Sequence, residues 1–563
     1  MKRILSLLLS AAMAMCLLSG CDLQSAADSL QEYIAGIQTD SAENPHLDYN
    51  LNQALVDSFY HALEKSEKLS IAGEDMDKIQ QAAERLDDLY MELIDQDQIA
   101  YILYCIDQKS EEASQRYLEI EEILNQADTD YNAMLKRVYL SDTPVRDELF
   151  ADWTQEEIDI MLLHNDEVAR LEQRNTELTV AYYELDPATF DEEMIPLYNE
   201  LVANNNRIAQ IYGYPDYYTY ASRVIYQRDY GESQLQMLRR YASEYLPTVC
   251  DSVIESFYAT YQQLSEEENV LLLELLSDAY DSLETDYVQL YLKQMPESAG
   301  TDMMGMFAGD RAVFTQSKSA LSGAFTVWID SDPFCYYGPD YQDCETVIHE
   351  LGHYYGGLYM EPWSMSIDIC ETQSQGNEWL FLRFLEEHAQ PQIYSCLTDY
   401  KLMSELTGIL GFVILDEFEQ RIYCHENAGN MTSEEYDRLL EDVAEGYGGI
   451  DYITENILDL RSYWKQVLLD NPVYYLSYAV SSCAAIDLYM TALEDEPRAW
   501  EIYCRLCEEA DAEKGFLENL QSVGLSGPFE ETLYKKLGKL LTKNQKKHLT
   551  NSAKAYIISK RDC

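Results

Sequence analysis

Residues 343–357 read DCETVIHELGHYYGG and place two histidines four positions apart, with a glutamate directly after the first. An α-helix turns once in about 3.6 residues, so His349 and His353 share one face and can bind one ion. Glu350 lies one position round the helix, where a carboxylate can take a proton from water beside that ion. Gly352, between the histidines, predicts close packing against another element.

The alternative interpretation is an amphipathic helix that happens to carry histidines. The chain has eight histidines in 563 residues, and chance places them in this motif in about one such chain in a hundred. No cysteine or histidine cluster nearby completes a structural zinc site of the usual kind. The stretch therefore favours a hydrolytic metal site.

A catalytic zinc ion needs a third protein ligand and one open position, and the following segment supplies a candidate. Residues 364–388, SMSIDICETQSQGNEWLFLRFLEEH, are helical in pattern, with Glu371, Ser374 and Glu378 at helical spacing. The connection before them contains glycines and a proline, which can reverse the chain. Two antiparallel helices would then direct both histidines and Glu371 toward one ion. His388, at the end of the segment, is interpreted as a surface histidine rather than a rival ligand.

The segment before the motif breaks the helical pattern. Residues 323–340, GAFTVWIDSDPFCYYGPD, are rich in glycine, proline, β-branched and aromatic residues. We predict strands at 323–329 and 334–337, with a turn at 330–333 between them. An edge strand beside the metal helix can pair with an extended peptide. The candidate substrate-binding residues of this strand are Gly323, Ala324, Phe325 and Thr326.

A tyrosine cluster follows much later in the chain. Residues 471–493, NPVYYLSYAVSSCAAIDLYMTAL, carry Tyr474 and Tyr478 on one helix face, with Tyr475 nearby. Phenols can donate hydrogen bonds to an oxyanion that develops during hydrolysis. A purely structural role is the alternative, because the chain contains 46 tyrosines.

Composition excludes one class of partner. Asp and Glu number 101 against 39 Lys and Arg, a net charge of −62. Such a surface repels phosphate backbones, so we expect no nucleic-acid partner. Hydrophobic residues make up 47% of the chain, enough for two or three domains or one large helical body. The cysteines are scattered, and those beyond residue 21 are odd in number, which favours buried thiols over disulfides.

The N-terminus has the pattern of a targeting signal. Residues 1–21, MKRILSLLLSAAMAMCLLSGC, have a basic start, a short apolar run and a Leu-Ser-Gly-Cys ending that resembles the lipobox of bacterial lipoproteins. The resemblance implies lipidation of Cys21 and a polar tether at 22–45. We expect an extracytoplasmic protein that is lipid-anchored to the bacterial cell membrane, without a later segment that spans the bilayer. The basic tail at 542–563 is interpreted as a solvated end, with contact to anionic lipid as the alternative.

Several spaced segments resemble peptidase family M3, the oligoendopeptidase F and thimet oligopeptidase group. DPFCYYGPDYQDCETVIHELGH (332–353) resembles the family's approach to its zinc helix, and ETQSQGNE (371–378) its E-x-x-S-x-x-x-E, whose first glutamate is the third zinc ligand. PVYYLSYAVSSCAA (472–485) resembles the tyrosine motif of the oligoendopeptidase branch. GILGFVILDEFEQRIY resembles the helix before that motif, and the long segment at 197–231 resembles the one that leads into the family's catalytic domain. The matches recur in order from about residue 197 to about residue 540.

The resemblance implies a mainly α, two-lobed metallopeptidase with a small β-sheet beside the zinc helix. A deep channel would separate a helical N-terminal lid domain at 46–195 from a catalytic domain at 196–541, and it would admit only short unfolded peptides. The resemblance also implies one Zn²⁺ per monomeric chain, bound by His349, His353 and Glu371. Glu350 would be the general base, Tyr478 and Tyr475 would stabilise the oxyanion, and Tyr474 would contact the substrate.

The expected activity is zinc-dependent endopeptidase hydrolysis of oligopeptides through metal-activated water. One alternative is a zinc metallocarboxypeptidase of similar helical fold, and another is a lipoprotein that binds peptides without cutting them. Two features differ from the family pattern. The connection between His353 and Glu371 is shorter, and Asn471 and Pro472 precede the tyrosines where many members carry a histidine.

Overall fold

The structure is a computed structural model, and it describes residues 44–151, 153–183, 185, 189–277, 287–339, 341–360, 365–469 and 471–540. The signal peptide predicted at 1–21, its Cys21, residues 22–43 of the tether and the basic tail at 542–563 lie outside the described residues.

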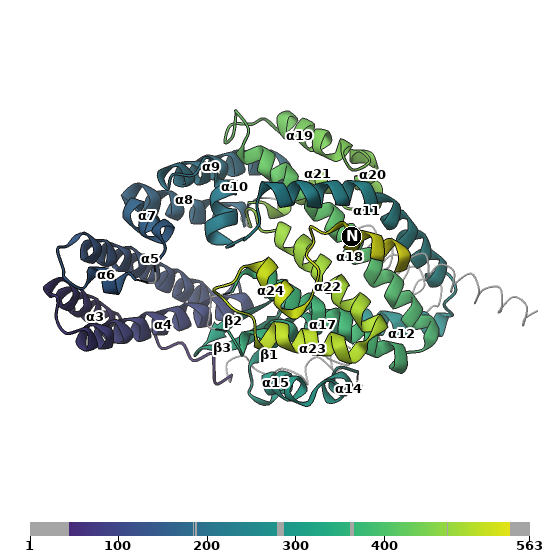
Figure 1. Cartoon of the computed structure of the whole chain (residues 1–563), viewed down its shortest axis with the longest axis horizontal. Helices are drawn as coiled ribbons and strands as arrows, with labels where there is room; N and C mark the ends of the chain where they lie inside the picture. The colour runs from purple at the N-terminus through teal and green to yellow at the C-terminus, as the bar shows by residue number, and fades with distance from the viewer. Residues whose placement is uncertain are drawn as a thin grey trace, which may run out of the picture.

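The first helices form an N-terminal lobe, at the left of Figure 1. This lobe has a hydrophobic core of its own, in which Phe59, Leu93 and Ile120 are buried. Local caps determine where its helices begin: Ser110 accepts a hydrogen bond from the third residue of α5, and Thr154 forms a capping box at α7. The helices of the lobe are α3 (Gln53–Ala72), α4 (Met76–Ile106), α5 (Glu111–Leu140), α6 (Arg146–Leu149) and α7 (Gln155–Leu163).

A second group of helices connects this lobe to the rest of the chain. The domain boundary predicted at residue 195 lies inside the continuous helix α9, and side chains from Leu178 onward already belong to the main core. The group consists of α8 (Asp166–Tyr183), α9 (Phe190–Ile211), α10 (Tyr217–Tyr220), the π-helix η2 (Ala221–Ile225), α11 (Glu232–Tyr261) and α12 (Glu266–Ser277).

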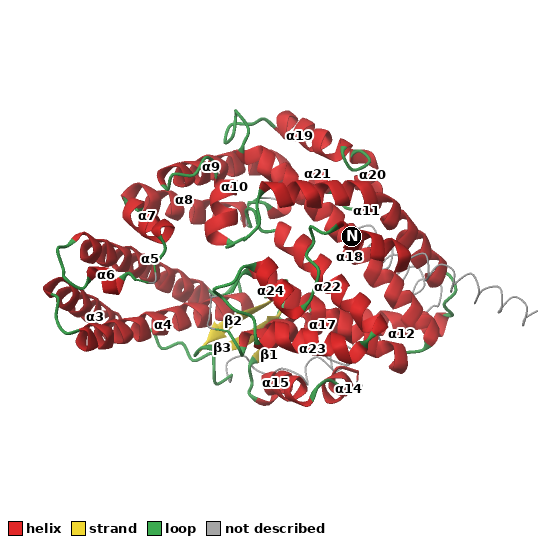
Figure 2. Cartoon of the chain, in the orientation of Figure 1, coloured by secondary structure: helices red, strands yellow, loops and turns green. Residues whose placement is uncertain are grey.

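A small three-stranded sheet lies between the N-terminal lobe and the helices of the C-terminal half (Figure 2). The strand order is β1-β3-β2, with β1 parallel and β2 antiparallel to β3. Asp330 and Ser331, the two residues between β2 and β3, both have positive φ (54° and 65°), as in a type I′ hairpin turn. The strands are β1 (Ala312–Phe314), β2 (Ala324–Ile329) and β3 (Asp332–Tyr337).

These strands correct the sequence prediction in two details. The predicted turn at 330–333 is too long, because Asp332 and Pro333 already pair with β2. Proline is tolerated there, since the pairing of β1 with β3 begins only at Cys335. The strand β1 was not predicted, because three residues carry too little periodicity to be distinguished from a loop.

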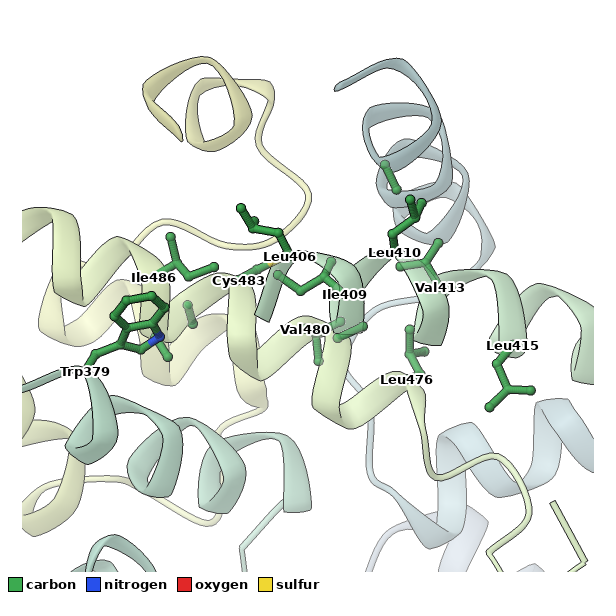
Figure 3. Close-up of a cluster of buried hydrophobic side chains, with 14 of the residues drawn as sticks. Trp379, Leu406, Ile409, Leu410, Val413, Leu415, Leu476, Val480, Cys483 and Ile486 are labelled. Atoms are coloured by element: carbon green, nitrogen blue, oxygen red, sulfur yellow. The ribbon is translucent and has the colours of Figure 1, made fainter. Parts of the chain in front are cut away.

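The main core lies among long helices of the C-terminal half, where α22 packs against α17 and α18. Figure 3 shows Leu410 and Val413 of α18 in this core, with Val480 of α22 and Trp379 of α17. The helices from residue 287 to the end of the described chain are α14 (Tyr287–Gln294), α15 (Glu297–Ala308), α16 (Cys344–Gly357), α17 (Ile367–His388), α18 (Pro391–Tyr423), α19 (Ser433–Glu445), α20 (Ile450–Asn456), α21 (Leu460–Val467), α22 (Leu476–Glu494), α23 (Glu496–Glu508) and α24 (Phe516–Val523).

One of these helices corrects the expectation that no later segment is apolar enough to span a bilayer. By length and hydropathy α22 meets that criterion, but 78% of its most apolar window is buried inside the structure. Its apolar side chains therefore form the centre of the core. The expected mainly helical fold with a small sheet beside the motif helix is confirmed.

Candidate metal centre

Glycines bring the two helices of the centre unusually close together. A Cβ added at Gly352 of α16 would lie 2.6 Å from the Cα of Ser374 on α17, and one at Gly356 would overlap the side chain of Gln373. Real Cβ atoms do not approach backbone atoms so closely, so only glycine fits at position 352, whereas a Cβ at position 356 would require the end of the Gln373 side chain to move. The close packing predicted from Gly352 is therefore confirmed, with α17 as the partner. Asp343 caps α16 through the backbone N–H of Thr346 (3.0 Å).

This contact places three donor side chains around one point. His349 Nε2 and His353 Nε2 lie 3.1 Å apart, and Glu371 Oε2 lies 3.5 Å from the first and 3.7 Å from the second. Zinc bonds of about 2.0–2.1 Å in tetrahedral geometry require donor separations of about 3.3 Å. The three distances bracket that value, so the residues present fit a zinc ion.

Two of the three donors are in the protonation state that suits a cation. The third, His349, has to lose a proton when a cation binds: burial alone would lower its pKa, but its hydrogen bonds with Glu371 and Glu378 raise that pKa well above the ordinary value. Burial lowers the pKa of His353 to about 4, so its imidazole is neutral at physiological pH. Burial alone would raise the pKa of Glu371, but the neighbouring histidines and a hydrogen bond from Tyr474 bring it down to about 2. Neutral imidazoles and an ionised carboxylate are the forms that bind zinc.

A second layer of charged groups orients His349. Its Nδ1 lies 2.5 Å from Glu378 Oε1, so the other ring nitrogen is directed at the metal position. Glu378 in turn contacts the buried ammonium of Lys401. Lys401 also donates to Glu345 (2.5 Å) and Glu405 (2.7 Å), which makes it the centre of three carboxylates.

Glu350 lies beside the donors on the side of the sheet. The hydroxyl of Thr326 on β2 donates to Glu350 Oε2 (2.6 Å), so the strand holds this carboxylate directly. Burial raises the pKa of Glu350 to about 7, although His349 and Thr326 act against the rise. A carboxyl group with such a pKa suits proton transfer near neutral pH.

The predicted substrate strand β2 is an edge strand of the sheet. Side chains alternate along it: Thr326 faces Glu350, whereas Phe325 contacts the aromatic ring of Tyr101 on α4. Ala324 pairs with Tyr337 of β3. Gly323 precedes the strand, and its carbonyl accepts a hydrogen bond from Gly338 (2.8 Å).

The three predicted tyrosines occupy different positions. The hydroxyl of Tyr474 donates to Glu371 Oε1 (2.8 Å), the oxygen opposite the one that faces the histidines. Tyr478, one helical turn later, has its hydroxyl 3.5 Å from that of Tyr474. Burial raises the pKa of the Tyr478 phenol, and the negative charges of Glu371 and Glu350 raise it further. The rings of Tyr475 and Tyr478 both pack against Phe412.

Sequence reasoning missed Lys401 and the side-chain role of Thr326. Lys401 lies on α18, and its only local signal is Glu405 one helical turn later. Such a pair is usually found on a solvent-exposed helix face. His388, the rival ligand considered above, stacks on Phe384 at the far end of α17 from Glu371.

Comparison with known proteins gives the fold an independent reference. No protein-family model matches the chain, and no curated protein matches it in sequence. Among solved structures, PZ peptidase A with an inhibitor superposes with a TM-score of 0.70 at 18% identity, covering 88% of this chain and 98% of that one.

Two further solved structures share the fold. An oligoendopeptidase F from Bacillus anthracis has a TM-score of 0.67 at 16% identity, covering 88% of this chain and 96% of its own. An M32 carboxypeptidase from Deinococcus radiodurans has a TM-score of 0.50 at 13% identity, covering 86% and 100%. The fold that the sequence motifs implied is thus confirmed.

Proposed function

We propose that this chain, which has the oligoendopeptidase fold, is a zinc-dependent endopeptidase of the M3 type that hydrolyses short unfolded peptides. One observation carries the proposal: His349, His353 and Glu371 present three donor atoms at zinc spacing, with Glu350 buried beside them. A zinc ion held there would lower the pKa of water and polarise a peptide carbonyl.

The chain's own side chains transfer the proton, stabilise the oxyanion and orient a metal ligand. Glu350, held by Thr326 on the substrate strand, takes the proton of the attacking water and returns it to the leaving amine. Tyr478 donates a hydrogen bond to the oxyanion that develops on the carbonyl oxygen. Tyr474, for which the resemblance implies a substrate contact, also donates to Glu371 and keeps that ligand oriented.

The edge of β2 that faces away from β3 would bind the substrate backbone by strand addition. A peptide paired there would present alternate side chains to the metal site and to the N-terminal lobe, because side chains alternate along a strand. Backbone pairing is independent of side-chain identity, so we expect cleavage of many sequences.

The two buried cations near the site do not supply the anchor that the carboxypeptidase alternative needs. A carboxypeptidase binds the terminal carboxylate of its substrate, most simply with a cation. Among the described residues, Lys401 and Arg228 are the cationic side chains buried near the site, and both face carboxylates already. Neither is therefore available to a substrate terminus.

The test combines metal analysis with digestion of an internally quenched peptide blocked at both ends. We expect about one zinc per chain and internal cleavage that a chelator abolishes. Glu350→Gln should lower kcat by at least about a hundredfold while zinc remains bound. Glu417→Gln, at a partly buried glutamate on α18 that contacts Arg421 and Tyr447, is the control.

Each alternative has its own signature in this experiment. Cleavage that requires a free C-terminus would identify a carboxypeptidase, and peptide binding without metal-dependent cleavage would identify a binding protein. Full activity of the Glu350→Gln variant would contradict the proposed mechanism.

We further propose that lipid on Cys21 anchors the enzyme outside the cytoplasm, on the basis of the Leu-Ser-Gly-Cys ending of the N-terminal segment. Radioactive palmitate should label the full-length chain in bacterial cells, and Cys21→Ala should abolish both labelling and membrane association. An unlabelled full-length chain would overturn the anchor without affecting the peptidase proposal.

A further inference from the structure

The turn that leads into α22 contains a residue in an unfavourable backbone conformation. Val473 has φ of +62°, in the left-handed region, and it is buried. For a β-branched residue this conformation is disfavoured by roughly five- to thirtyfold, because Cβ approaches the following carbonyl oxygen. Other contacts must therefore hold the turn in place.

Two buried ionisable side chains, Glu419 and Arg228, supply those contacts. The N–H of Val473 donates to both carboxylate oxygens of Glu419 on α18, each at 2.9 Å. The carbonyl of Val473 accepts from Arg228 Nη2 (2.9 Å), and the same nitrogen donates to Ser477 Oγ in the first turn of α22 (3.0 Å). The hydroxyl of Tyr226 donates to the carbonyl of the preceding residue, Pro472 (2.7 Å).

The held turn determines the position of the next residue. Tyr474 follows Val473 directly, and its hydroxyl donates to Glu371 Oε1 (2.8 Å). The other oxygen of Glu371 faces His349 and His353. Hydrogen bonds to metal ligands of this kind set ligand orientation, and their loss typically lowers metal affinity by about 10- to 100-fold.

From this geometry we infer that Glu419 and Arg228 are positioning residues for the metal centre, which hold the Val473 turn so that Tyr474 orients Glu371. The inference rests on the proposed zinc site but not on peptide cleavage. Neither residue touches the metal ligands themselves. Glu419 reaches the centre through the turn, whereas Arg228 contacts the turn and also faces Asp368 on α17 (4.0 Å).

Zinc affinity, measured by competition with a chromogenic chelator, tests the inference. Glu419→Met should weaken zinc binding by about tenfold, whereas Glu419→Gln, which keeps a carbonyl acceptor for the Val473 N–H, should retain most of it. Glu417→Met applies the same change two residues earlier on the same helix, where the carboxylate contacts Arg421 and Tyr447. It should leave zinc affinity within about twofold of wild type.

A double-mutant cycle separates positioning from a general structural effect. Tyr474→Phe removes the hydrogen bond to Glu371 and should itself cost about tenfold in zinc affinity. If Glu419 acts through Tyr474, then Glu419→Met should cost less than about twofold in the Tyr474→Phe background. An unchanged tenfold cost in that background would overturn the inference, as would equal losses for the Glu417 and Glu419 variants.

A second cycle tests the backbone strain. Glycine adopts positive φ without penalty, so Glu419→Met should lower zinc affinity less in a Val473→Gly background than in wild type. Both the Val473→Gly variant and the double variant lack the valine side chain, so the effect of its loss cancels when the two are compared. An equal cost in the two backgrounds would show that Glu419 does not support the strained turn.

Failure of this inference can be distinguished from failure of the proposed function. A wild-type chain that binds zinc but cleaves no peptide would refute the peptidase proposal and leave both cycles interpretable. A wild-type chain that binds no zinc would overturn both. Circular dichroism of every variant checks that a lost affinity does not reflect unfolding.

Discussion

The close contact between α16 and α17 makes Gly352→Ala a sharp test of the metal centre. The added methyl carbon would lie 2.6 Å from Ser374 Cα and 2.8 Å from the carbonyl oxygen of Gln373. Carbon atoms pack at about 3.5 Å or more, so the helices would have to separate by up to about 0.9 Å. Both obstacles are backbone atoms of α17, which cannot rotate away as the end of a flexible side chain would.

The expected cost follows from two opposing effects. Overpacking a tight contact destabilises by about 1–3 kcal/mol, while replacing glycine by alanine inside a helix gains up to about 1 kcal/mol. We therefore expect a net loss of about 1–2 kcal/mol in the free energy of unfolding. The distances from Glu371 to the two histidines, now 3.5 and 3.7 Å, would exceed 4 Å, against about 3.3 Å for tetrahedral zinc. Zinc affinity should fall by at least about tenfold.

Urea unfolding followed by circular dichroism measures the first effect, and chelator competition measures the second. Gly305→Ala is the matched control, because it makes the same change in a helix where the nearest atom, the hydroxyl oxygen of Tyr354, is 3.7 Å away. That variant should be as stable as wild type or more so, with unchanged zinc affinity. Wild-type stability and zinc affinity in Gly352→Ala would refute the reasoning from close packing.

Three other perturbations probe neighbouring contacts. Thr326→Val removes the hydrogen-bond donor to Glu350 and should lower kcat by about 10-fold or more at unchanged zinc affinity. Thr326→Ser should restore the activity. A valine variant as active as wild type would show that the hydroxyl is dispensable. Lys401→Met leaves three carboxylates facing one another and should destabilise by about 3–5 kcal/mol and weaken zinc binding; wild-type melting would contradict this. Burial, and then the charge of Glu121, raise the pKa of Asp97 to about 7, so its protonated form is favoured in the folded state. The stabilisation of the folded state by this bound proton is complete below about pH 4 and is lost as the pH rises toward 7. Asp97→Asn should therefore gain stability relative to wild type between pH 4 and pH 8, by about 1–3 kcal/mol; a constant difference in unfolding free energy across that range would refute the shift.

Local periodicity was sufficient to predict the parts of the centre that lie on single helices. His349 and His353 are one turn apart in any α-helix, so their shared face follows from spacing alone. Glu371 was identifiable because its helix follows after a short connection and two such helices must pack against each other. Gly352, between the histidines, indicated close packing, since a residue without Cβ inside a helix usually serves a close contact.

Residues that act across the fold had no such signal. Lys401 reaches Glu378 from a different helix, and Glu419 reaches Val473 across 54 positions of sequence. A buried lysine or glutamate is indistinguishable in sequence from one on a solvent-exposed face, because charged residues are usually exposed. Only the packing of α18 against α17 and α22 turns these side chains inward.

The tyrosine cluster shows the same division between sequence and structure. The sequence alone determined that Tyr474 and Tyr478 lie four positions apart, and the motif resemblance associated them with the metal helix. Their predicted placement on one helix is wrong, because α22 begins at Leu476 and Tyr474 lies in the turn before it. The tertiary structure decided that Tyr474 bonds to Glu371, that Tyr478 lies beside it and that Tyr475 packs against Phe412. Spacing along a helix fixes which side chains point in one direction, but what lies in that direction depends on contacts between segments far apart in the chain. Such contacts are set by the burial and packing of the whole core, which no local pattern contains.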